Sequence, residues 1–404
     1  MTATTTEADD MDRRSIAVLA AGHAMVDACQ GAIPATLPFL IARRGYSYAE
    51  ATSLLLVMTV CSSLLQPLFG YITDRRSISW LLPGGVLLGG LGVAAVGLVH
   101  SHALTLAAVG IAGLGVGAYH PEGARNANYV AGNRRRATAM SLYGVGGNAG
   151  FAVGPVIVTG LVLAFGLGGL VGFALPMTLG AIWLARELPR IDSLRLATIA
   201  GAEAQPGGRG EDRWLPFAGI ATAAGFRSAA YFGLQAFVPI FLITTMGTSD
   251  AVGNAALTVL LASGVAGTLL GGALADRVGN KPVLVTSLGV ASPLILGLLA
   301  VNEAGAFALV ALIGFFLFGS FSIAVVLGQQ YLPNRIGVAS GVTLGAAIGF
   351  GGLVAWLLGL LADQTSLTTV MIVIAALPLP GFLISLALPG ENEAGQPSEE
   401  PARV

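Results

Sequence analysis

The chain has 404 residues, of which 55% are hydrophobic and only 10% are charged, and its mean hydropathy is +0.80. This composition excludes a soluble globular protein, because no soluble fold could cover so much apolar surface. The net charge of −1 gives no basic field of the kind that attracts nucleic acid, so we expect no nucleic-acid partner.

The first 14 residues are polar, and the apolar sequence begins directly behind them. They lack the short apolar core and cleavage site of a signal peptide, so we expect 1–14 to form a cytoplasmic tail. Twelve apolar runs follow, each with the length of about 20 residues that a membrane-spanning helix needs. Helices are expected because they satisfy all backbone polar groups internally, and the runs are too long for barrel strands. The expected spans lie near residues 15–41, 48–72, 79–99, 103–128, 137–163, 168–188, 215–244, 252–274, 282–301, 304–330, 338–361 and 368–388.

The distribution of cations predicts the orientation of these spans. If the N-terminus is inside, Arg43 and Arg44 fall outside the cell, and Arg125 and Arg227 lie within spans. The other sixteen of the twenty Lys and Arg residues then fall in cytoplasmic segments, as the positive-inside rule requires. We therefore predict an all-α integral membrane protein of the cell inner (plasma) membrane, multi-pass and monomeric, with both termini cytoplasmic.

The longest polar interval, 189–213, divides the chain into two sets of six spans. We predict an N-terminal six-helix bundle at 15–188, a cytoplasmic linker at 189–213, a C-terminal six-helix bundle at 214–388 and a cytoplasmic tail at 389–404. Repeated halves of this kind are typical of secondary transporters that rock around a central binding site.

Short motifs repeat between the two halves. One follows the second span and contains Gly70, Asp74 and Arg75; its counterpart after the eighth span contains Gly272, Asp276, Arg277, Gly279 and Lys281. Acidic and basic side chains at these cytoplasmic helix ends can pair with neighbouring helix termini and separate when the bundles rock. Glycines spaced by four also recur, and we expect each set to line one helix face and admit another backbone: Gly146, Gly150 and Gly154 in the fifth span, and Gly341, Gly345 and Gly349 in the eleventh.

The first span contains two titratable groups, His23 and Asp27, one helical turn apart. A charge in hydrocarbon costs at least ~2.5 kcal/mol, so intramembrane ionisable groups are taken as functional by default. We interpret Asp27 as the first candidate for proton coupling and His23 as its relay partner. Two alternatives stay open: Asp27 neutralises a cation on a neighbouring helix, and His23 donates to a backbone carbonyl at a helix contact.

Arg227 in the seventh span lies at a matching depth. Asp27 follows Arg14 by about 13 residues and Arg227 follows Arg213 by about 14, which places both roughly 20 Å into the membrane. Because the first and seventh spans are equivalent in the repeat, we expect both groups to face the central cavity, where such transporters hold substrate. The guanidinium matches carboxylate or phosphonate oxygens, and a fixed bridge between Arg227 and Asp27 is the alternative.

The fourth span contains a second polar group of residues. Glu122 is a further candidate for proton coupling, whereas a structural ion pair with Arg125 at i, i+3 is the alternative. His120 and Arg125 could offer positive charge to an entering anion, and Pro121 should bend the helix here. Neutral side chains that could also contact substrate are Tyr119, Asn148, Tyr231 and Gln235.

These motifs resemble a known family. The Asp276 segment is similar to the loop signature of the major facilitator superfamily, and Gly150, Gly154 and Pro155 resemble the fifth-span signature of its antiporters. The first loop copy departs from the pattern, since Ser77 stands where a glycine is usual. Four blocks resemble the fosmidomycin resistance family of drug exporters: Gly22-HAMV-Asp27, Tyr119-HPEGA-Arg125, Met140-SLYGVGGNAGFAVGP and Leu332-PNRIGVASGVTLGAAIGFGG.

The resemblance implies proton-coupled export of a small anionic drug or metabolite, such as a phosphonate antibiotic, by drug:proton antiport. Uptake of an organic anion by proton symport and a transporter-like membrane sensor are the alternatives. No metal-ligand spacing, G-x-S-x-G motif or phosphate-binding loop is present in the sequence, so we expect no enzyme activity and no cofactor. The expected partners are the substrate, protons and membrane lipids.

Overall fold

Helices form every regular element in the described part of this computed structural model, which comprises residues 11–64, 66, 68–69, 78–131, 136–201 and 211–389. In the first half they are α1 (Arg13–Arg44), α2 (Tyr48–Thr59) with a π-helical turn (η1, Val60–Leu64), α4 (Leu81–Leu98), α5 (His102–Tyr129), α6 (Arg136–Phe165), a 3₁₀ segment (η2, Leu167–Phe173) and α7 (Ala174–Gly201).

The second half repeats this series of helices. It contains α8 (Trp214–Thr244), α9 (Asp250–Val278), α10 (Asn280–Gly297), α11 (Glu303–Gly319), α12 (Phe321–Tyr331), α13 (Ile336–Ser340), a second π-helical turn (η3, Gly341–Ala346), α14 (Ala347–Gln364), α15 (Leu367–Ala376) and α16 (Pro378–Ala387).

Helices occupy all twelve expected span positions. Within the described residues, ten are long and apolar enough to cross a membrane, some of them built from two consecutive elements such as α11 with α12. The segment Tyr48–Leu64 is a shorter apolar helix at the second position, and α10 occupies the ninth. The fold is therefore that of an all-helical, multi-pass membrane protein.

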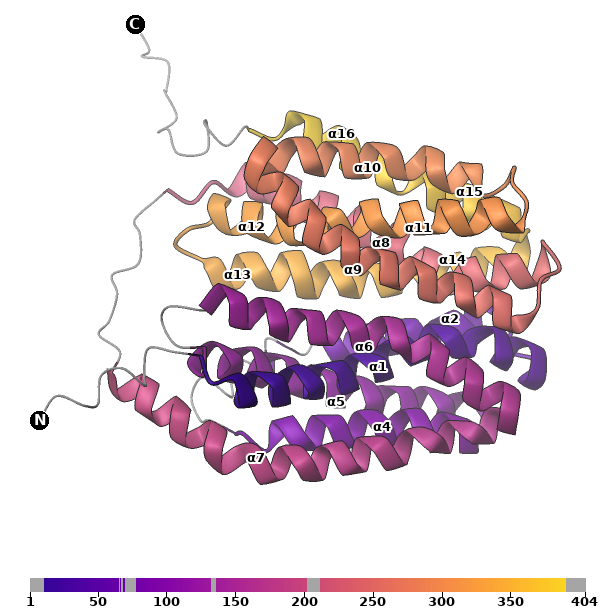
Figure 1. Cartoon of the computed structure of the whole chain (residues 1–404). Helices are drawn as coiled ribbons and strands as arrows, with labels where there is room; N and C mark the ends of the chain where they lie inside the picture. The colour runs from indigo at the N-terminus through magenta and orange to yellow at the C-terminus, as the bar shows by residue number, and fades with distance from the viewer. Residues whose placement is uncertain are drawn as a thin grey trace, which may run out of the picture.

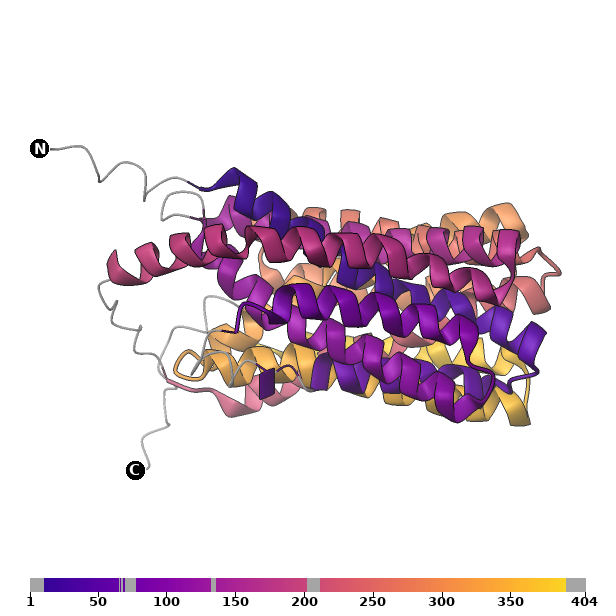
Figure 2. The same cartoon turned by 90° about the horizontal axis from the view of Figure 1, so that it is seen from below.

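The two halves lie side by side with their helices roughly parallel to one long direction (Figure 1). Helix α1 begins, α7 ends, α8 begins and α16 ends at one end of this bundle, which we call the terminal end; both views agree on this (Figures 1 and 2). We call the opposite end the distal end. An even number of crossings in each half explains why the chain returns to the same end.

Glycines bring α1 and α6 into backbone contact. A Cβ at Gly146, Gly150 or Gly154 would collide with the backbone of α1, at Ala20, Ala24 and Ala28 respectively. Only hydrogen at these positions allows the two backbones to approach so closely. The expected packing face of the fifth span is thus present, and it fixes the register of α1 against α6.

In the eleventh span, the described contacts confirm one of the three predicted glycines, Gly345. A Cβ at Gly345 would lie 3.1 Å from the Ser63 carbonyl oxygen, whereas a Cβ at Gly341 or Gly349 would have none of the described residues within 4 Å. The close approaches fall later in the helix: Gly351 lies against Ser228 of α8, while Gly352 and Gly359 lie against α2. The π-helical turn η3 begins at Gly341 and changes the helical register, so spacing by four no longer marks one face.

Contacts between the halves concentrate toward the distal end. Helix α2 packs along α14 and α6 packs against α9, whereas α12 and α13 pack chiefly within their own half. The Asp363 carboxylate accepts hydrogen bonds from the backbone N–H groups of Tyr48 (2.8 Å) and Ala49 (2.9 Å) at the start of α2. Nearby, the Asn254 side chain donates to the Ala35 carbonyl at 3.2 Å. These bonds join the two halves toward the distal end of the bundle.

Candidate functional site

A cavity of about 340 Å³ lies between the two halves at the middle of the helices. Asp27 from α1 and Arg227 from α8 both line it, as the matching depths in the sequence predict. The other lining residues are His23, Gln30, Ser63, Gln66, His120, Gly144, Asn148, Phe151, Ser228, Tyr231, Phe232, Phe318, Phe321, Leu344 and Ile348. The cavity thus combines a polar wall from the first half with a largely aromatic wall from the second.

His23 is held by two contacts with α6. Its Nδ1 lies 2.9 Å from the Tyr143 carbonyl, and its ring stacks on the Tyr143 ring with centroids 4.2 Å apart. The other ring nitrogen, Nε2, lies 3.3 Å from Asp27 Oδ2. A Cβ at Gly147 would collide with both His23 and Asp27, so the missing side chain of this glycine provides the space that they occupy.

His120 of α5 completes a cluster with Asp27 and His23. Its Nε2 lies 3.2 Å from Asp27 Oδ1, and its Nδ1 lies 2.8 Å from the Val116 carbonyl one turn earlier. The two imidazole rings meet edge to face with centroids 5.0 Å apart. His120 was predicted to offer positive charge together with Arg125, but in the structure it lies against Asp27. We call His23, Asp27 and His120 the His–Asp–His cluster.

The cluster has donor atoms of two kinds. Its ligand-type nitrogen and oxygen atoms all lie within 4.8 Å of one another, an arrangement that could also attract a transition-metal ion. A chelator in a transport assay therefore keeps metal ions away from this cluster.

Arg227 stands on the opposite wall without a carboxylate. Its side chain is buried, with 3% of the residue exposed, and one terminal nitrogen donates to Ser228 Oγ at 3.1 Å. The guanidinium carbon lies 4.9 Å from the centre of the Phe321 ring, within the range of a cation–π contact. Nε has no hydrogen-bond partner, and no carboxylate of the described residues forms an ion pair with this group. The fixed bridge between Arg227 and Asp27 is thus not formed in this structure.

The sequence matches the profile of the Major Facilitator Superfamily over residues 19–355. The chain belongs to the Major Facilitator Superfamily. It is therefore a transporter rather than an enzyme. It is 32% identical over 379 residues to the fosmidomycin resistance protein of Escherichia coli (strain K12), covering 92% of both chains. It is also 32% identical over 377 residues to an uncharacterized superfamily transporter, YfnC, of Bacillus subtilis (strain 168), covering 92% of this chain and 91% of that one.

Solved structures support the same fold. A bacterial homologue of the human lysosomal transporter Spinster, in an inward-facing and occupied conformation, superposes with a TM-score of 0.77 at 14% identity, covering 95% of this chain and 98% of the other. Its inward-facing, unoccupied structure gives a TM-score of 0.74. At this identity the similarity concerns the superfamily fold alone.

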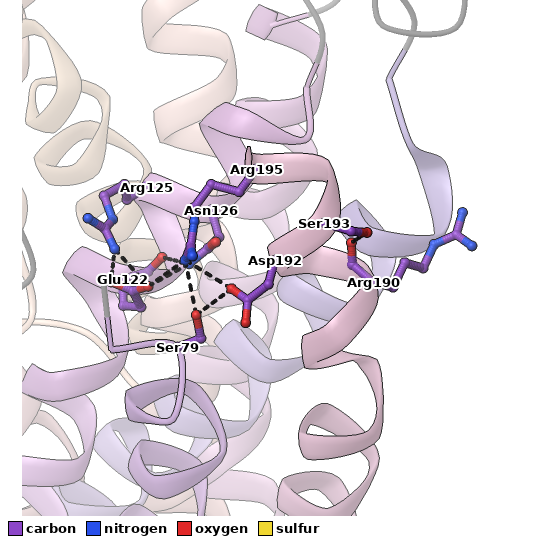
Figure 3. Close-up of polar contacts among 8 residues, drawn as sticks. All are labelled: Ser79, Glu122, Arg125, Asn126, Arg190, Asp192, Ser193 and Arg195. Carbon is purple, nitrogen blue, oxygen red and sulfur yellow. Dashed lines mark hydrogen bonds and ion pairs between the residues drawn. The ribbon is translucent and has the colours of Figure 1, made fainter. Parts of the chain in front are cut away.

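Glu122 lies away from the cavity of this superfamily member, although it is only two residues from His120. It is fully buried and accepts hydrogen bonds from Arg125 at 2.8 and 3.0 Å and from Asn126 at 2.9 Å (Figure 3). Because two residues turn a helix by about 200°, His120 and Glu122 leave α5 on opposite sides. The ion pair with Arg125 that the sequence analysis left as the alternative is present.

The Glu122 network extends to α7. Arg195 lies 3.9 Å from the Glu122 carboxylate and 2.9 Å from Asp192, and it donates to Ser79 Oγ at 3.0 Å (Figure 3). Ser79 donates in turn to Asp192 at 2.6 Å. These contacts join α5, α7 and the residues before α4 at the terminal end, so the network has a structural role in this conformation.

The neutral candidates divide between the cavity and the core. Asn148 and Tyr231 line the cavity, and the Tyr231 hydroxyl has no hydrogen-bond partner among the described residues. Tyr119 is fully buried and donates to the Leu19 carbonyl at 2.6 Å, and Gln235 is buried outside the cavity lining. Gln30 was missed, although its spacing of seven from His23 and three from Asp27 places it on the same face of α1.

The loop signatures lie at the terminal end. Asp276 and Arg277 end α9 in exposed positions, and neither has an ion-pair partner among the described residues. Gly279 follows with φ of 93°, a conformation that favours glycine, and a Cβ at Gly272 would meet nothing within 4 Å. Lys281 donates to the Leu388 carbonyl at 2.5 Å. In the first copy, Gly70, Asp74 and Arg75 lie outside the described residues.

Proposed function

We propose that this transporter exports a small anionic compound, of the phosphonate type that fosmidomycin represents, in exchange for protons. The observation that carries the proposal is Arg227, a buried guanidinium that lines the cavity and is not neutralised by any described carboxylate. A permanent charge at mid-membrane depth needs an anion to compensate it. A phosphonate supplies several oxygens to the planar donors, with charge-assisted hydrogen bonds.

The direction of transport is proposed from similarity. A relative at 32% identity is named a fosmidomycin resistance protein, and a membrane transporter confers resistance most directly by removing the drug from the cell. The Gly150, Gly154 and Pro155 motif, which resembles the antiporter signature, supports exchange with protons as the driving reaction.

Asp27 is the group that we propose for proton coupling, with His23 as its partner. It lines the same cavity as Arg227, so the proton site and the proposed drug site are open to one volume in this conformation. Glu122 is not part of the proposal, because its carboxylate is held by Arg125 and Asn126 outside the cavity.

We further propose that all twelve helices span the inner membrane with both termini cytoplasmic, and that the protein acts as a monomer. The cavity, which is bounded distally by the contacts of α2 with α14, then opens to the cytoplasm. Asp276 and Arg277 pair with neighbouring helix ends only when the terminal ends of the two halves come together. They therefore stabilise the conformation in which the cavity is closed to the cytoplasm and open to the outside. Asp74 and Arg75 are proposed to do the same in the first half.

The proposal is tested with purified protein in liposomes that contain a trapped pH indicator and a chelator, with the membrane potential clamped. Addition of fosmidomycin to one side should drive protons in the direction opposite to the drug, and Arg227→Met should abolish both fluxes. Drug flux without any proton movement, or no drug flux at all, would contradict the proposal.

Proton symport of an organic anion is a second candidate, and one observation favours it. The His–Asp–His cluster and Arg227 line one cavity, so protonation of the cluster adds positive charge beside the guanidinium. This positive charge stabilises a bound anion while the protons are bound. The same liposomes distinguish the two reactions. In symport the pH indicator reports protons that move with the drug, so the sign of the pH change decides between them.

A further inference from the structure

We propose that His120 is the second imidazole of a two-proton site, in which His23 and His120 each hold one proton against a different oxygen of Asp27. Each transport cycle then moves two protons. This inference rests on the proposed proton coupling, and it holds for antiport and symport alike.

The backbone contacts of the two rings fix where each can titrate. A carbonyl oxygen only accepts hydrogen bonds, so the nitrogen that faces it must carry hydrogen. Nδ1 of His23 faces the Tyr143 carbonyl at 2.9 Å, and Nδ1 of His120 faces the Val116 carbonyl at 2.8 Å. Both Nδ1 atoms are therefore donors in every functional protonation state. The one titrating atom of each ring is Nε2, and both Nε2 atoms face Asp27.

The contacts with Asp27 are separate, and each needs a proton of its own. Nε2 of His23 lies 3.3 Å from Oδ2, and Nε2 of His120 lies 3.2 Å from Oδ1. Without a proton, each pair brings a nitrogen lone pair against an anionic oxygen in a medium of low dielectric, which is repulsive. One proton relieves one contact and leaves the other unrelieved. Two protons convert both contacts into ion pairs, and they change the charge of the cluster from −1 to +1.

No other titratable group among the described residues contacts Asp27 in this way. Helix α4 has no titratable residue, and Glu187 of α7 pairs with Arg14 at the terminal end. On α5, Tyr119 donates to the Leu19 carbonyl and Glu122 belongs to the separate network with Arg125. The remaining titratable or charged groups near the cluster are Tyr143 on α6, whose ring stacks on His23, Cys29 on α1, and Arg227 and Tyr231 across the cavity.

The exposed fractions of the side chains indicate the order in which protons reach the two imidazoles. The side chain of His120 is 24% exposed, that of Asp27 is 14% exposed and that of His23 is 11% exposed. His120 thus meets the water of the cavity first, and Asp27 lies between it and His23. Protons enter and leave through His120.

The number of protons is measured in the chelator-containing liposomes as the drug gradient that a fixed pH gradient balances at zero net flux. With the membrane potential clamped at zero, one pH unit balances a drug ratio of roughly 100-fold if two protons move and roughly 10-fold if one moves. We expect about 100-fold for the wild type and about 10-fold for His120→Asn. The asparagine amide can still donate to the Val116 carbonyl, but it has no atom in the place of Nε2.

His102→Asn is the matched control, because His102 contacts Ser53 Oγ at 2.9 Å outside the cluster. It should retain the wild-type ratio. If His120→Asn does not transport, protons released or taken up on addition of fosmidomycin to the detergent-solubilised protein are counted instead, with two expected for the wild type and one for the variant. A wild-type count of one, or an unchanged count in His120→Asn, overturns the inference and leaves proton coupling intact. A wild-type count of zero overturns proton coupling itself.

Discussion

Replacement of Arg227 by lysine tests whether the guanidinium binds the anionic substrate. In the structure one terminal nitrogen is occupied by Ser228 Oγ at 3.1 Å, while Nε has no partner and the group lines the cavity. A phosphonate that enters the cavity can accept charge-assisted hydrogen bonds from more than one nitrogen of this planar group. Lysine keeps the charge but offers no planar pair, so one charge-assisted bond is lost.

A hydrogen bond to a charged group contributes about 1.5–3 kcal/mol. Its loss should weaken phosphonate binding by roughly 10- to 150-fold in Arg227→Lys. Arg227→Met, which also removes the charge, should bind more weakly still. Titration calorimetry with fosmidomycin on the detergent-solubilised protein measures both values, and thermal unfolding of the same samples shows whether each variant is folded.

Arg186→Lys is the control for this substitution, because Arg186 is exposed and lies outside the cavity. It should bind as the wild type does. A dissociation constant in Arg227→Lys within about threefold of the wild-type value would refute the reasoning, since no geometric advantage of the guanidinium would remain to be explained.

Four further substitutions test other parts of the structure. Asp27→Asn should remain folded but lose proton-coupled transport in the liposome assay. The neutral amide has no negative charge with which to stabilise protons on His23 and His120, and wild-type proton flux in this variant would contradict the prediction. Glu122→Gln leaves Arg125 with a neutral partner in a buried site, so it should lower stability by about 3 kcal/mol in thermal unfolding, yet leave the number of transported protons unchanged. Gly150→Ala places a methyl group against the Ala24 carbonyl and should cost about 1–3 kcal/mol, whereas Gly160→Ala in the same helix, with nothing within 4 Å, should be neutral; equal melting temperatures would show that α1 and α6 do not need this contact. Asp363→Ala removes a cap of α2 that joins the halves, so it should shift the conformational equilibrium by about 1 kcal/mol, seen as roughly fivefold more labelling of cysteines placed at the distal end.

The sequence alone determined the helical, multi-pass architecture of two repeated halves. These features depend on the length of apolar runs and on the number of crossings, which are local properties of the chain. It also identified Asp27 and Arg227 as groups at one depth, since the rise per residue of a helix converts sequence position into depth. The face of α6 that carries Gly146, Gly150 and Gly154 was predictable for the same reason, because it is set by regular helical periodicity.

Only the tertiary structure decided which groups meet. Helical periodicity places His120 and Glu122 on opposite sides of α5, but it does not say which side faces the cavity. The packing of α5 against α1 brings His120 into contact with Asp27, and the packing of α5 against α7 brings Glu122 close to Arg195. The Phe321 ring beneath Arg227 has no signal in the sequence, since aromatic residues are common throughout apolar spans. Gly351, Gly352 and Gly359 of the eleventh span were missed as contact glycines because a π-helical turn shifts the register by a local change that regular spacing cannot reveal. The rotation of each helix about its axis is set by how its whole surface packs against several neighbours at once. For that reason the depth of a residue in the membrane could be predicted from the sequence, but the side chains that it contacts could not.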